Sequence, residues 1–198
     1  MLTSQDLELK FKIKFKMNPK IKSVNEITQL ALELKKLGKT IGFTSGAFDI
    51  LHAGHIDYLH KAKEKCDVLI LALNSDESIK KYKDPNRPIN TFARRAKVVA
   101  SLEMVDYVFG FEETNNHLNI ERLKPDFYIK AGDYTMDKLT SAPLVEKYGG
   151  KVIVIPIIEK TSTSETIKKL MQLEQLKKAE CITESIELPK PTEKVKVV

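Results

Sequence analysis

Residues 40–63 read TIGFTSGAFDILHAGHIDYLHKAK, and this stretch decides the fold. Its apolar first part has the length of a buried strand. The second part repeats apolar residues at helical spacing, with Ile56, Leu59 and Ala62 on one side. The pattern predicts a strand followed directly by a helix over about residues 54–65, which is the repeating unit of parallel α/β proteins.

Four more short apolar runs follow along the chain and are separated by helical patterns. They read DVLILALN, DYVFGF, FYIKAG and KVIVIPI. This alternation predicts an α/β protein with a Rossmann-like parallel sheet of about five strands and helices on both faces. The runs Val68–Leu73 and Val152–Ile155 are apolar without alternation, which is typical of strands buried on both faces. We therefore expect both runs to be central strands.

Local signals predict the bounds of two further helices. Ser23 and Glu26 have the spacing of a capping box and Gly38 is a stop signal, so a leading helix is predicted over residues 23–37. Another helix is predicted to begin near Thr91, after a proline turn.

The two ends of the chain differ in pattern from its middle. Up to Met17, apolar residues alternate with charged ones, which is strand periodicity. This segment either pairs as an edge strand or extends outside the core, and the pattern leaves both open. Prolines and a polar mixture predict weak order after about residue 180. We therefore divide the chain into an N-terminal extension (1–22), a working domain (23–175) and a C-terminal tail (176–198).

Composition favours a soluble chain with anionic partners. Hydrophobic residues make up 42% and charged residues 30% of the 198 residues, and no apolar run approaches the roughly 18 residues of a spanning helix. The start of the chain lacks the apolar core of an export signal, and Cys66 and Cys181 form no metal-type cluster. We therefore expect a cytoplasmic protein without a membrane partner. The net charge of +6 fits nucleic acids and phosphorylated metabolites equally well.

A phosphate cradle is predicted at residues 46–55, where the first core strand passes into its helix. Ligands bind at this end of the strands in parallel α/β folds. A helix start presents free N–H groups and the positive end of the helix dipole, and both favour phosphate. His52 and His55 are three residues apart, so they face the same side of the opening turn and can contact one polyphosphate together. The same spacing also fits half of a metal site or a helix cap.

A second helix start is predicted at Ser162, Thr163 and Ser164, which precede an amphipathic stretch. Aimed at the same strand ends, this start would offer another anion site. Residues of these types are also ordinary helix caps, and composition alone does not separate the two roles.

The stretch Gly46–His55 resembles the GxFDxxHxGH signature of the cytidylyltransferase-like nucleotidyltransferase family. The resemblance runs through about residues 23–170, and within the family it is greatest to bacterial D-glycero-β-D-manno-heptose 1-phosphate adenylyltransferases. It is carried further by NSD (74–76) with DPNRPIN (84–90), LEMVDYV (102–108), KAGDY (130–134) with GGKV (149–152), and STS (162–164). The resemblance implies the HxGH nucleotidyltransferase fold for the working domain.

The resemblance also implies roles for individual residues. It implies catalytic roles for His52, His55 and Lys83. It implies that the nucleotide contacts Ser45, Gly46, Ala47, Phe48, Asp49, Gly54, Lys130, Gly132, Asp133, Ser162, Thr163 and Ser164. It implies that the substrate contacts Asn74, Asp76, Lys81, Arg87 and Arg95, with no metal ligand from the protein. Lys81 and Lys83 also fit a reading as surface lysines, and the preference for Lys83 is slight.

The reaction implied is adenylyl transfer from ATP to heptose 1-phosphate, giving ADP-heptose and pyrophosphate. Relatives in this family are commonly homodimers, and Mg²⁺ is expected to be held through the substrate phosphates. ATP is favoured over CTP because the cytidylyltransferase branch typically has arginines where this chain has Glu103-Met104 and Glu159–Thr161. The alternatives are a cytidylyltransferase acting on glycerol 3-phosphate or another alcohol phosphate, and a basic nucleic-acid-binding protein. The latter would leave the quoted motifs without a purpose.

The chain departs from the pattern of these relatives at Ser45, Ala47, Ala93 and Ala131. Ala131 replaces the first glycine of KGGDY, and an alanine forced to a positive φ would cost roughly 1–2 kcal/mol. We therefore expect either an ordinary backbone at Ala131 or a slightly different pocket.

Overall fold

The computed structural model describes residues 18–132, 139–156 and 163–185, with side chains of the last range described up to residue 177. The chain forms two compact units, residues 1–160 and 161–198. Of the described residues, the first unit contains a sheet with its covering helices, and the second contains the helix α8 (Thr163–Ser185).

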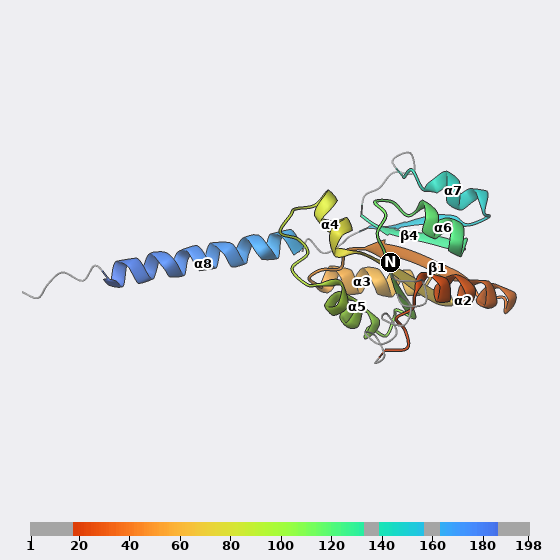
Figure 1. Ribbon diagram of the computed structural model, residues 1–198, viewed down its shortest axis with the longest axis horizontal. Coiled ribbons are helices and arrows are strands. Elements are labelled where there is room, and N and C mark those ends of the chain that lie inside the picture. The colour runs from red at the N-terminus through yellow and green to blue at the C-terminus, as the bar shows by residue number, and fades with distance from the viewer. Residues whose placement is uncertain (1–17, 133–138, 157–162, 186–198) are drawn as a thin grey trace, which may run out of the picture. The chain divides into compact units, whose positions relative to one another are not determined.

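The first unit is built on one parallel sheet with the strand order β3-β2-β1-β4-β5 (Figure 1). The strands are β1 (Ile41–Gly46), β2 (Val68–Asn74), β3 (Tyr107–Phe111), β4 (Phe127–Ala131) and β5 (Lys151–Ile155). They coincide with the five apolar runs, so the predicted sheet is confirmed. Along the chain, β2 and β3 are added on one side of β1, and β4 and β5 are added on its other side. The strand order therefore reverses between β1 and β4.

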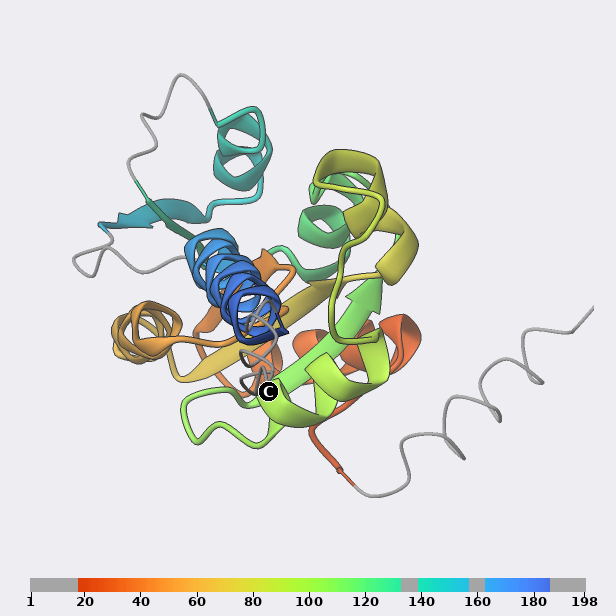
Figure 2. The ribbon, with the colours of Figure 1, turned by 90° about the vertical axis from the view of Figure 1, so that its left-hand side faces the viewer.

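Helices cover both faces of this sheet, as predicted (Figure 2). The helices on one face are α3 (Ala53–Lys63) and α5 (Phe92–Ala100), and those on the other are α2 (Val24–Lys36), α6 (His117–Leu123) and α7 (Ala142–Lys147). The short helix α4 (Asp76–Tyr82) follows β2 directly.

The helix α2 begins and ends where local signals predict. The Ser23 side chain accepts a hydrogen bond from the Glu26 amide, and the Glu26 carboxylate accepts one from the Ser23 amide, so the capping box is complete. Gly38 has a φ of 71°, a left-handed backbone that glycine adopts without strain at the end of a helix. The helix itself ends at Lys36.

The last residues of the predicted N-terminal extension pack on the sheet. The Lys22 amide donates to the Val108 carbonyl at 2.9 Å, and the Val108 amide donates to the Lys20 carbonyl at 2.9 Å. Ile21 therefore lies beside β3 in parallel orientation. Residues 1–17, with their alternating pattern, lie outside the described residues, and the boundary after residue 22 stays a prediction.

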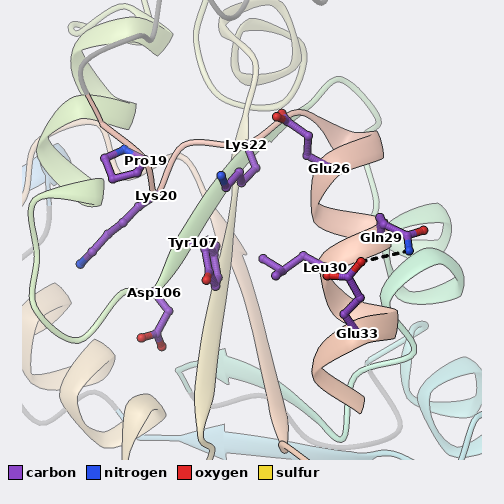
Figure 3. A pocket seen from close by; sticks show the side chains of 9 residues that line it. All are labelled: Pro19, Lys20, Lys22, Glu26, Gln29, Leu30, Glu33, Asp106 and Tyr107. Atoms are coloured by element: carbon purple, nitrogen blue, oxygen red, sulfur yellow. Dashed lines mark hydrogen bonds between the residues drawn. The ribbon is translucent and has the colours of Figure 1, made fainter. Parts of the chain in front are cut away.

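A cavity of about 680 Å³ lies next to this segment (Figure 3). It is bounded by Pro19, Lys20 and Lys22, by α2 with Glu26 and Glu33, and by Tyr107 at the start of β3. Its wall carries charges of both signs, and the Lys20 ammonium in it already donates to two main-chain carbonyls. The cavity lies where β3 begins, whereas the predicted phosphate cradle lies where β1 ends.

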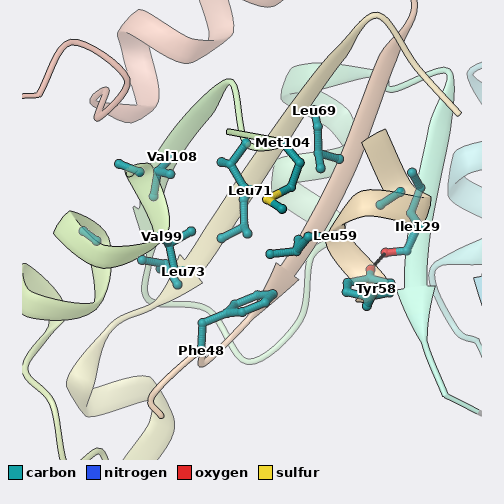
Figure 4. Packing of buried hydrophobic residues seen from close by; sticks show 14 of the residues in the cluster. Phe48, Tyr58, Leu59, Leu69, Leu71, Leu73, Val99, Met104, Val108 and Ile129 are labelled. Carbon is teal, nitrogen blue, oxygen red and sulfur yellow. Dashed lines mark hydrogen bonds between the residues drawn. The ribbon is translucent and has the colours of Figure 1, made fainter. Parts of the chain in front are cut away.

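The core between the sheet and the helices α3 and α5 is mostly aliphatic, with Phe48 and Tyr58 among its members (Figure 4). Leu59 of α3 and Val99 of α5 pack with Leu69, Leu71 and Leu73 of β2, and all five side chains have 0% exposure. Full burial of a side chain of this kind contributes about 1.5–3 kcal/mol. This layer holds α3, which carries the two candidate histidines, against the sheet.

The strand β5 lies at an edge of the sheet, so the prediction that Val152–Ile155 is a central strand is wrong. Val152 packs against the cluster on the α2 face, while Ile153 and Ile155 pack against the cluster on the α3 face. Residues Val152–Ile155 are apolar because both faces of the strand are covered by helices. The apolar character of a strand does not indicate whether a neighbouring strand pairs with each of its two edges. The corresponding prediction for Val68–Leu73 is confirmed, since β2 lies between β1 and β3.

The helix α8 begins at Thr163, as the serine and threonine cluster predicts. It is continuous to Ser185 and passes through residue 176, where the predicted tail begins. Residues 186–198 lie outside the described part of the chain, so the tail boundary stays a prediction. Within the described ranges, no helix combines the length and the apolar character that crossing a membrane requires.

A buried tyrosine joins β1 and β4 where their ladder ends. The two strands pair at two positions only, the second being Phe43 with Tyr128. Tyr58 of α3 then places its hydroxyl 2.6 Å from Thr44 Oγ1 and donates to the Ile129 carbonyl at 2.9 Å. Burial raises the pKa of Tyr58 far above its usual value, so the hydroxyl stays protonated. The Tyr58 hydroxyl therefore bonds to both strands at the point where the main-chain hydrogen bonds between β1 and β4 end.

Tyr58→Phe should lower the free energy of unfolding by about 1–3 kcal/mol, because it leaves buried polar groups of Thr44 and Ile129 without their partner. Urea denaturation followed by circular dichroism measures the change. Tyr148→Phe is the matched control, since that ring is half-buried near the Lys124 and Lys147 ammonium groups. Equal stability of Y58F and the wild type would contradict this account of the strand junction.

Candidate phosphate-binding site

The turn between β1 and α3 has a strained backbone. Phe48 has a φ of 44°, in the left-handed region that residues other than glycine rarely adopt. Its ring lies 5.2 Å from the His55 ring, measured between centroids. A Cβ at Gly46 would lie 2.9 Å from a Phe48 ring atom, so glycine gives this ring its space. Ala47 and Gly54 are buried in the same turn and the following helix start, and strain of this kind clusters at functional sites.

His52 and His55 lie side by side at the start of α3, with ring centroids 3.9 Å apart. His52 is the N-cap residue, and in the described structure its side chain makes no capping hydrogen bond. The reading of His52 as an ordinary helix cap is therefore not supported. The helix start also carries amides without intrahelical partners and the positive end of the helix dipole. The pair thus lies where an anion is stabilised.

His55 is held in its neutral form. Burial, the neighbouring His52 and the charge of Lys83 together lower the pKa of His55 to about 4. At neutral pH the imidazole therefore has one N–H donor and one acceptor nitrogen. An anion bound beside it would oppose the repulsion from Lys83 and raise this pKa.

Lys83 and Arg87 bring two more basic groups to the same region. Burial and the charge of Arg87 lower the pKa of Lys83, and Lys83 in turn acts on His55. Lys83 is exposed along part of its length, whereas Arg87 is only 9% exposed. We call His52, His55, Lys83 and Arg87 the basic group. Neighbouring members of this group lie close enough together for their charges to interact.

The Asp49 carboxylate is engaged inside the protein. It accepts hydrogen bonds from Arg87 Nε at 2.9 Å, from the Ile89 amide at 2.8 Å and from the Asn90 amide at 2.7 Å. Burial acts to raise the pKa of Asp49, but the hydrogen bonds from Asn90, Ile89 and Arg87 outweigh it and hold the pKa below its usual value. The carboxylate fastens the segment of residues 87–90 to the β1–α3 turn, and its contact with a nucleotide stays a prediction.

Two buried nitrogen atoms of this basic group have no hydrogen-bond partner among the described residues. They are His55 Nδ1 and Arg87 Nη2. A buried polar atom without a partner costs about 1–3 kcal/mol. Phosphate oxygens would accept from Arg87 Nη2, and from His55 Nδ1 in the tautomer that carries a proton there. The residues present therefore fit a phosphate group.

Four of the five predicted substrate contacts, Asn74, Asp76, Arg87 and Arg95, are engaged with protein groups. Arg95 is fully buried and donates to the Asp76 carboxylate and the Asn74 carbonyl. The Asn74 side-chain amide donates to the Ser78 hydroxyl. Lys81, by contrast, is exposed in the last turn of α4. The contacts of these residues with a substrate stay predictions.

The ends of β1 and β4 carry further predicted nucleotide contacts. Ser45 of β1 and Lys130 of β4 are both half-buried, and Gly132 follows β4 with a φ of 116°. Ala131 lies in β4 without a positive φ, which confirms the ordinary backbone expected there. In parallel α/β sheets, ligands bind where the strand order reverses, and that point lies between β1 and β4 in this protein.

Sequence reasoning missed Asn116. Its Nδ2 donates to Ser45 Oγ at 2.8 Å, and its Oδ1 accepts from Asn119 Nδ2 at 3.3 Å. It is 9% exposed and immediately precedes α6. Nothing in its local pattern distinguishes it from a loop asparagine, because its partner Ser45 is 71 positions away in the chain.

Four predicted nucleotide contacts lie beyond the described part of the first unit. Asp133 and Ser162 are outside the described residues. Thr163 and Ser164 lie in the first turn of α8, in the second compact unit. The convergence of two helix starts on one triphosphate therefore stays a prediction.

The described residues form no cluster of metal-ligand side chains around the histidine pair. Among residues 18–132, 139–156 and 163–185, no group of three or more His, Cys, Asp and Glu side chains could hold a metal ion. The reading of the pair as half of a metal site therefore finds no support in the described structure.

Comparison with known proteins supports the family and the fold. A sequence model of the family described as cytidylyltransferase-like matches residues 43–184, which include the β1–α3 turn with its two histidines. The chain belongs to the cytidylyltransferase-like family. Its five-stranded parallel sheet with helices on both faces is the predicted Rossmann-like nucleotidyltransferase fold.

Several known proteins illustrate the similarity of this cytidylyltransferase-like chain. The "Bifunctional protein HldE" of Mesorhizobium japonicum is 47% identical over 136 residues, which are 69% of this chain and 27% of that protein. A protein of the same name from Paramagnetospirillum magneticum is 42% identical over 151 residues, 76% of this chain and 31% of that protein. The chain thus spans about three tenths of the length of these relatives. A crystal structure of the lipopolysaccharide core biosynthesis protein from Thermoplasma volcanium superposes with a TM-score of 0.53 at 26% identity, over 63% of this chain and 100% of that one.

The free energy of unfolding should fall as the pH is lowered from about 6.5 to about 4, and His55→Asn should remove part of this fall. The unfolded chain binds a proton at His55 near pH 6.5, whereas the folded chain binds it only near pH 4, so acid favours unfolding across this range. Urea denaturation at closely spaced pH values measures the slope. His60→Asn is the matched control because His60 is exposed on the same helix. Identical slopes for H55N and the wild type would contradict the low pKa of His55.

Proposed function

We propose that the chain transfers the adenylyl group of ATP to heptose 1-phosphate. The sugar phosphate oxygen attacks the α-phosphorus of ATP, a new P–O bond forms, and the bond from the α-phosphorus to the bridging oxygen breaks. The products are ADP-heptose and pyrophosphate. Membership of the cytidylyltransferase-like family and the similarity to the HldE proteins and to a lipopolysaccharide core biosynthesis protein support this proposal.

The observation that carries the proposal is the basic group formed by His52, His55, Lys83 and Arg87 at the end of β1. Burial first, and then the charge of a neighbouring basic residue, lowers the pKa values of His55 and Lys83. A polyphosphate supplies both the negative charge that relieves the repulsion between neighbouring basic residues and the acceptor oxygens for the buried donors. If these four basic residues lay on an exposed surface, solvent would screen the repulsion between their charges. An anionic ligand would then not be needed to relieve it.

The protein's contribution to the reaction is alignment and charge stabilisation. The attacking oxygen is already anionic at neutral pH, so no general base is needed. His52 and His55 would donate hydrogen bonds to the oxygens that gain charge as the α-phosphorus is attacked. Lys83 and Arg87 would stabilise the departing pyrophosphate.

The ends of β1 and β4, between which the strand order reverses, are the proposed place for the nucleoside part. Ser45 lies at the end of β1 and is oriented by Asn116. Lys130 and Gly132 lie at the end of β4, opposite this position. Asp133, Ser162, Thr163 and Ser164 are proposed as further nucleotide contacts from the family resemblance alone.

Mg²⁺ would be held mainly by substrate phosphates and water, which is its usual mode of binding. When bound, it neutralises phosphate charge and orients the leaving pyrophosphate. The choice of ATP over CTP rests on the residues Glu103-Met104 and Glu159–Thr161, which lack the arginines of the cytidylyltransferase branch. A cytoplasmic homodimer is proposed from the same resemblance.

Purified protein should release pyrophosphate when given ATP, Mg²⁺ and D-glycero-β-D-manno-heptose 1-phosphate, and ADP-heptose should appear in equal amount. A coupled pyrophosphate assay with mass spectrometry of the product measures both. The controls are heptose without the 1-phosphate, CTP in place of ATP, and glycerol 3-phosphate in place of the sugar. Turnover with CTP and an alcohol phosphate alone would replace the proposal with the cytidylyltransferase. Salt-sensitive binding to duplex DNA without nucleotide turnover would replace it with a nucleic-acid-binding function.

His55→Ala should lower kcat by about 10²–10³-fold, because it removes a donor to the developing charge. Its melting temperature at neutral pH should stay close to that of the wild type, since the neutral ring of His55 makes few polar bonds that stabilise the fold. His60→Ala, on the exposed side of α3, should keep the wild-type kcat. Loss of folding in H55A, with normal turnover of the remaining folded protein, would make the histidine structural.

A further inference from the structure

We propose that Arg95 is a positioning residue for this reaction and does not contact the substrate. The inference rests on the proposed function and departs from the role implied by the family resemblance. It starts from the burial of the Arg95 side chain, which has 0% exposure although arginine is rarely found fully buried.

The Arg95 guanidinium is occupied by protein acceptors. Nε donates to the Asn90 carbonyl at 3.0 Å, and Nη1 donates to the Ala47 carbonyl at 2.6 Å. Nη2 donates to the Asn74 carbonyl at 2.8 Å and to Asp76 Oδ1 at 2.7 Å. Four of the five N–H donors of an arginine are thus accounted for, and the Asp76 carboxylate balances the charge.

The four acceptors belong to three segments that meet at the end of the sheet. Ala47 lies in the turn between β1 and α3, and Asn90 lies shortly before α5. Asn74 ends β2, and Asp76 begins α4. Asp76 also accepts a hydrogen bond from the Phe92 amide at 3.1 Å, which fastens the start of α5 to the start of α4. One planar group therefore fixes the distances among all three segments.

Each of these segments carries part of the basic group. The turn at Ala47 leads into His52 and His55, and Lys83 directly follows α4. Arg87 lies in the segment that ends at Asn90. A shift of any one segment would move its basic residue relative to the others. Arg95 is the described side chain whose bonds reach all three segments at once.

Arg87 and Arg95 differ in whether their Nη2 atoms have hydrogen-bond partners. Arg87 has a buried Nη2 without a partner in the described structure, whereas Arg95 Nη2 already serves two acceptors. Arg87 is therefore the arginine of this region that has a whole guanidinium nitrogen without a partner in the described structure, and this nitrogen could donate to an anion. A lysine at position 95 would keep the charge but would lose the planar fork that spans the three segments.

The experiment compares Arg95→Lys with Arg94→Lys, a matched change at the exposed neighbouring position. Steady-state kinetics are measured with ATP and heptose 1-phosphate well below the melting temperature of each variant. R95K should lose on the order of 100-fold in kcat, as expected for misplacement of reacting groups, with a much smaller change in either KM. R94K should match the wild type. An R95K variant with wild-type kcat below its melting temperature would make Arg95 merely structural and overturn the proposal.

A second measurement uses the wild type and does not need turnover. Phenylglyoxal labelling of the folded protein, followed by peptide mass spectrometry, reports which arginines are accessible. Arg94 should be labelled, and Arg95 should be protected equally with and without ATP. Labelling of Arg95 in the free protein that ATP suppresses would make it a substrate contact and overturn the proposal.

The two hypotheses fail in different ways. A wild type without pyrophosphate release disproves the proposed function by itself. The positioning of the three segments is then decided by amide NMR spectra of R95K, in which the resonances of Ala47, Asn74 and Asn90 should all shift. Unchanged resonances at these residues would overturn the inference whatever the activity of the wild type.

Discussion

The end of β1 brings basic side chains together against their mutual repulsion, and the surrounding structure holds them there. Burial and neighbouring charge lower the pKa of His55 to about 4, and they also lower the pKa of Lys83. Buried donors on His55 and Arg87 find no partner among the described residues. These features destabilise the folded protein by itself, and a polyphosphate would relieve each of them. Under the proposed function, this loss of stability is the counterpart of affinity for a phosphate anion.

Two internal networks hold this arrangement in place. Asp49 fastens residues 87–90 to the β1–α3 turn, and Arg95 joins that turn to the end of β2 and the start of α4. Both side chains are buried, so removal of one partner would leave an uncompensated charge at a cost of several kcal/mol. Below them, the aliphatic layer around Leu59 and Leu71 resists displacement of the helices. The basic group therefore has a rigid support, which a reaction dependent on alignment requires.

The reversal of strand order separates the ends of β1 and β4, which is where ligands bind in parallel α/β folds. The chains leaving β1 and β4 run to opposite faces of the sheet, so the two strands part after a short ladder. Tyr58 supplies the hydrogen bonds that the ladder no longer makes, and Asn116 orients Ser45 on the other face. Under the proposed function, the α3 start would bind phosphate, and polar groups at the ends of β1 and β4 would contact the rest of the nucleotide. The similarity to the HldE proteins and the cytidylyltransferase-like family agrees with this reading.

The sequence by itself determined the strands, most helices and the location of the histidine pair. These follow from short-range patterns, such as the capping box at Ser23 and the passage from an apolar run into the helix after His52. Only the tertiary structure decided that β5 is an edge strand, that Asp49 and Arg95 serve internal networks, and that Asn116 reaches Ser45. The reason is physical: local patterns report backbone preference and the covering of faces, whereas strand order and hydrogen bonding depend on partners that are distant in the chain and meet only on folding.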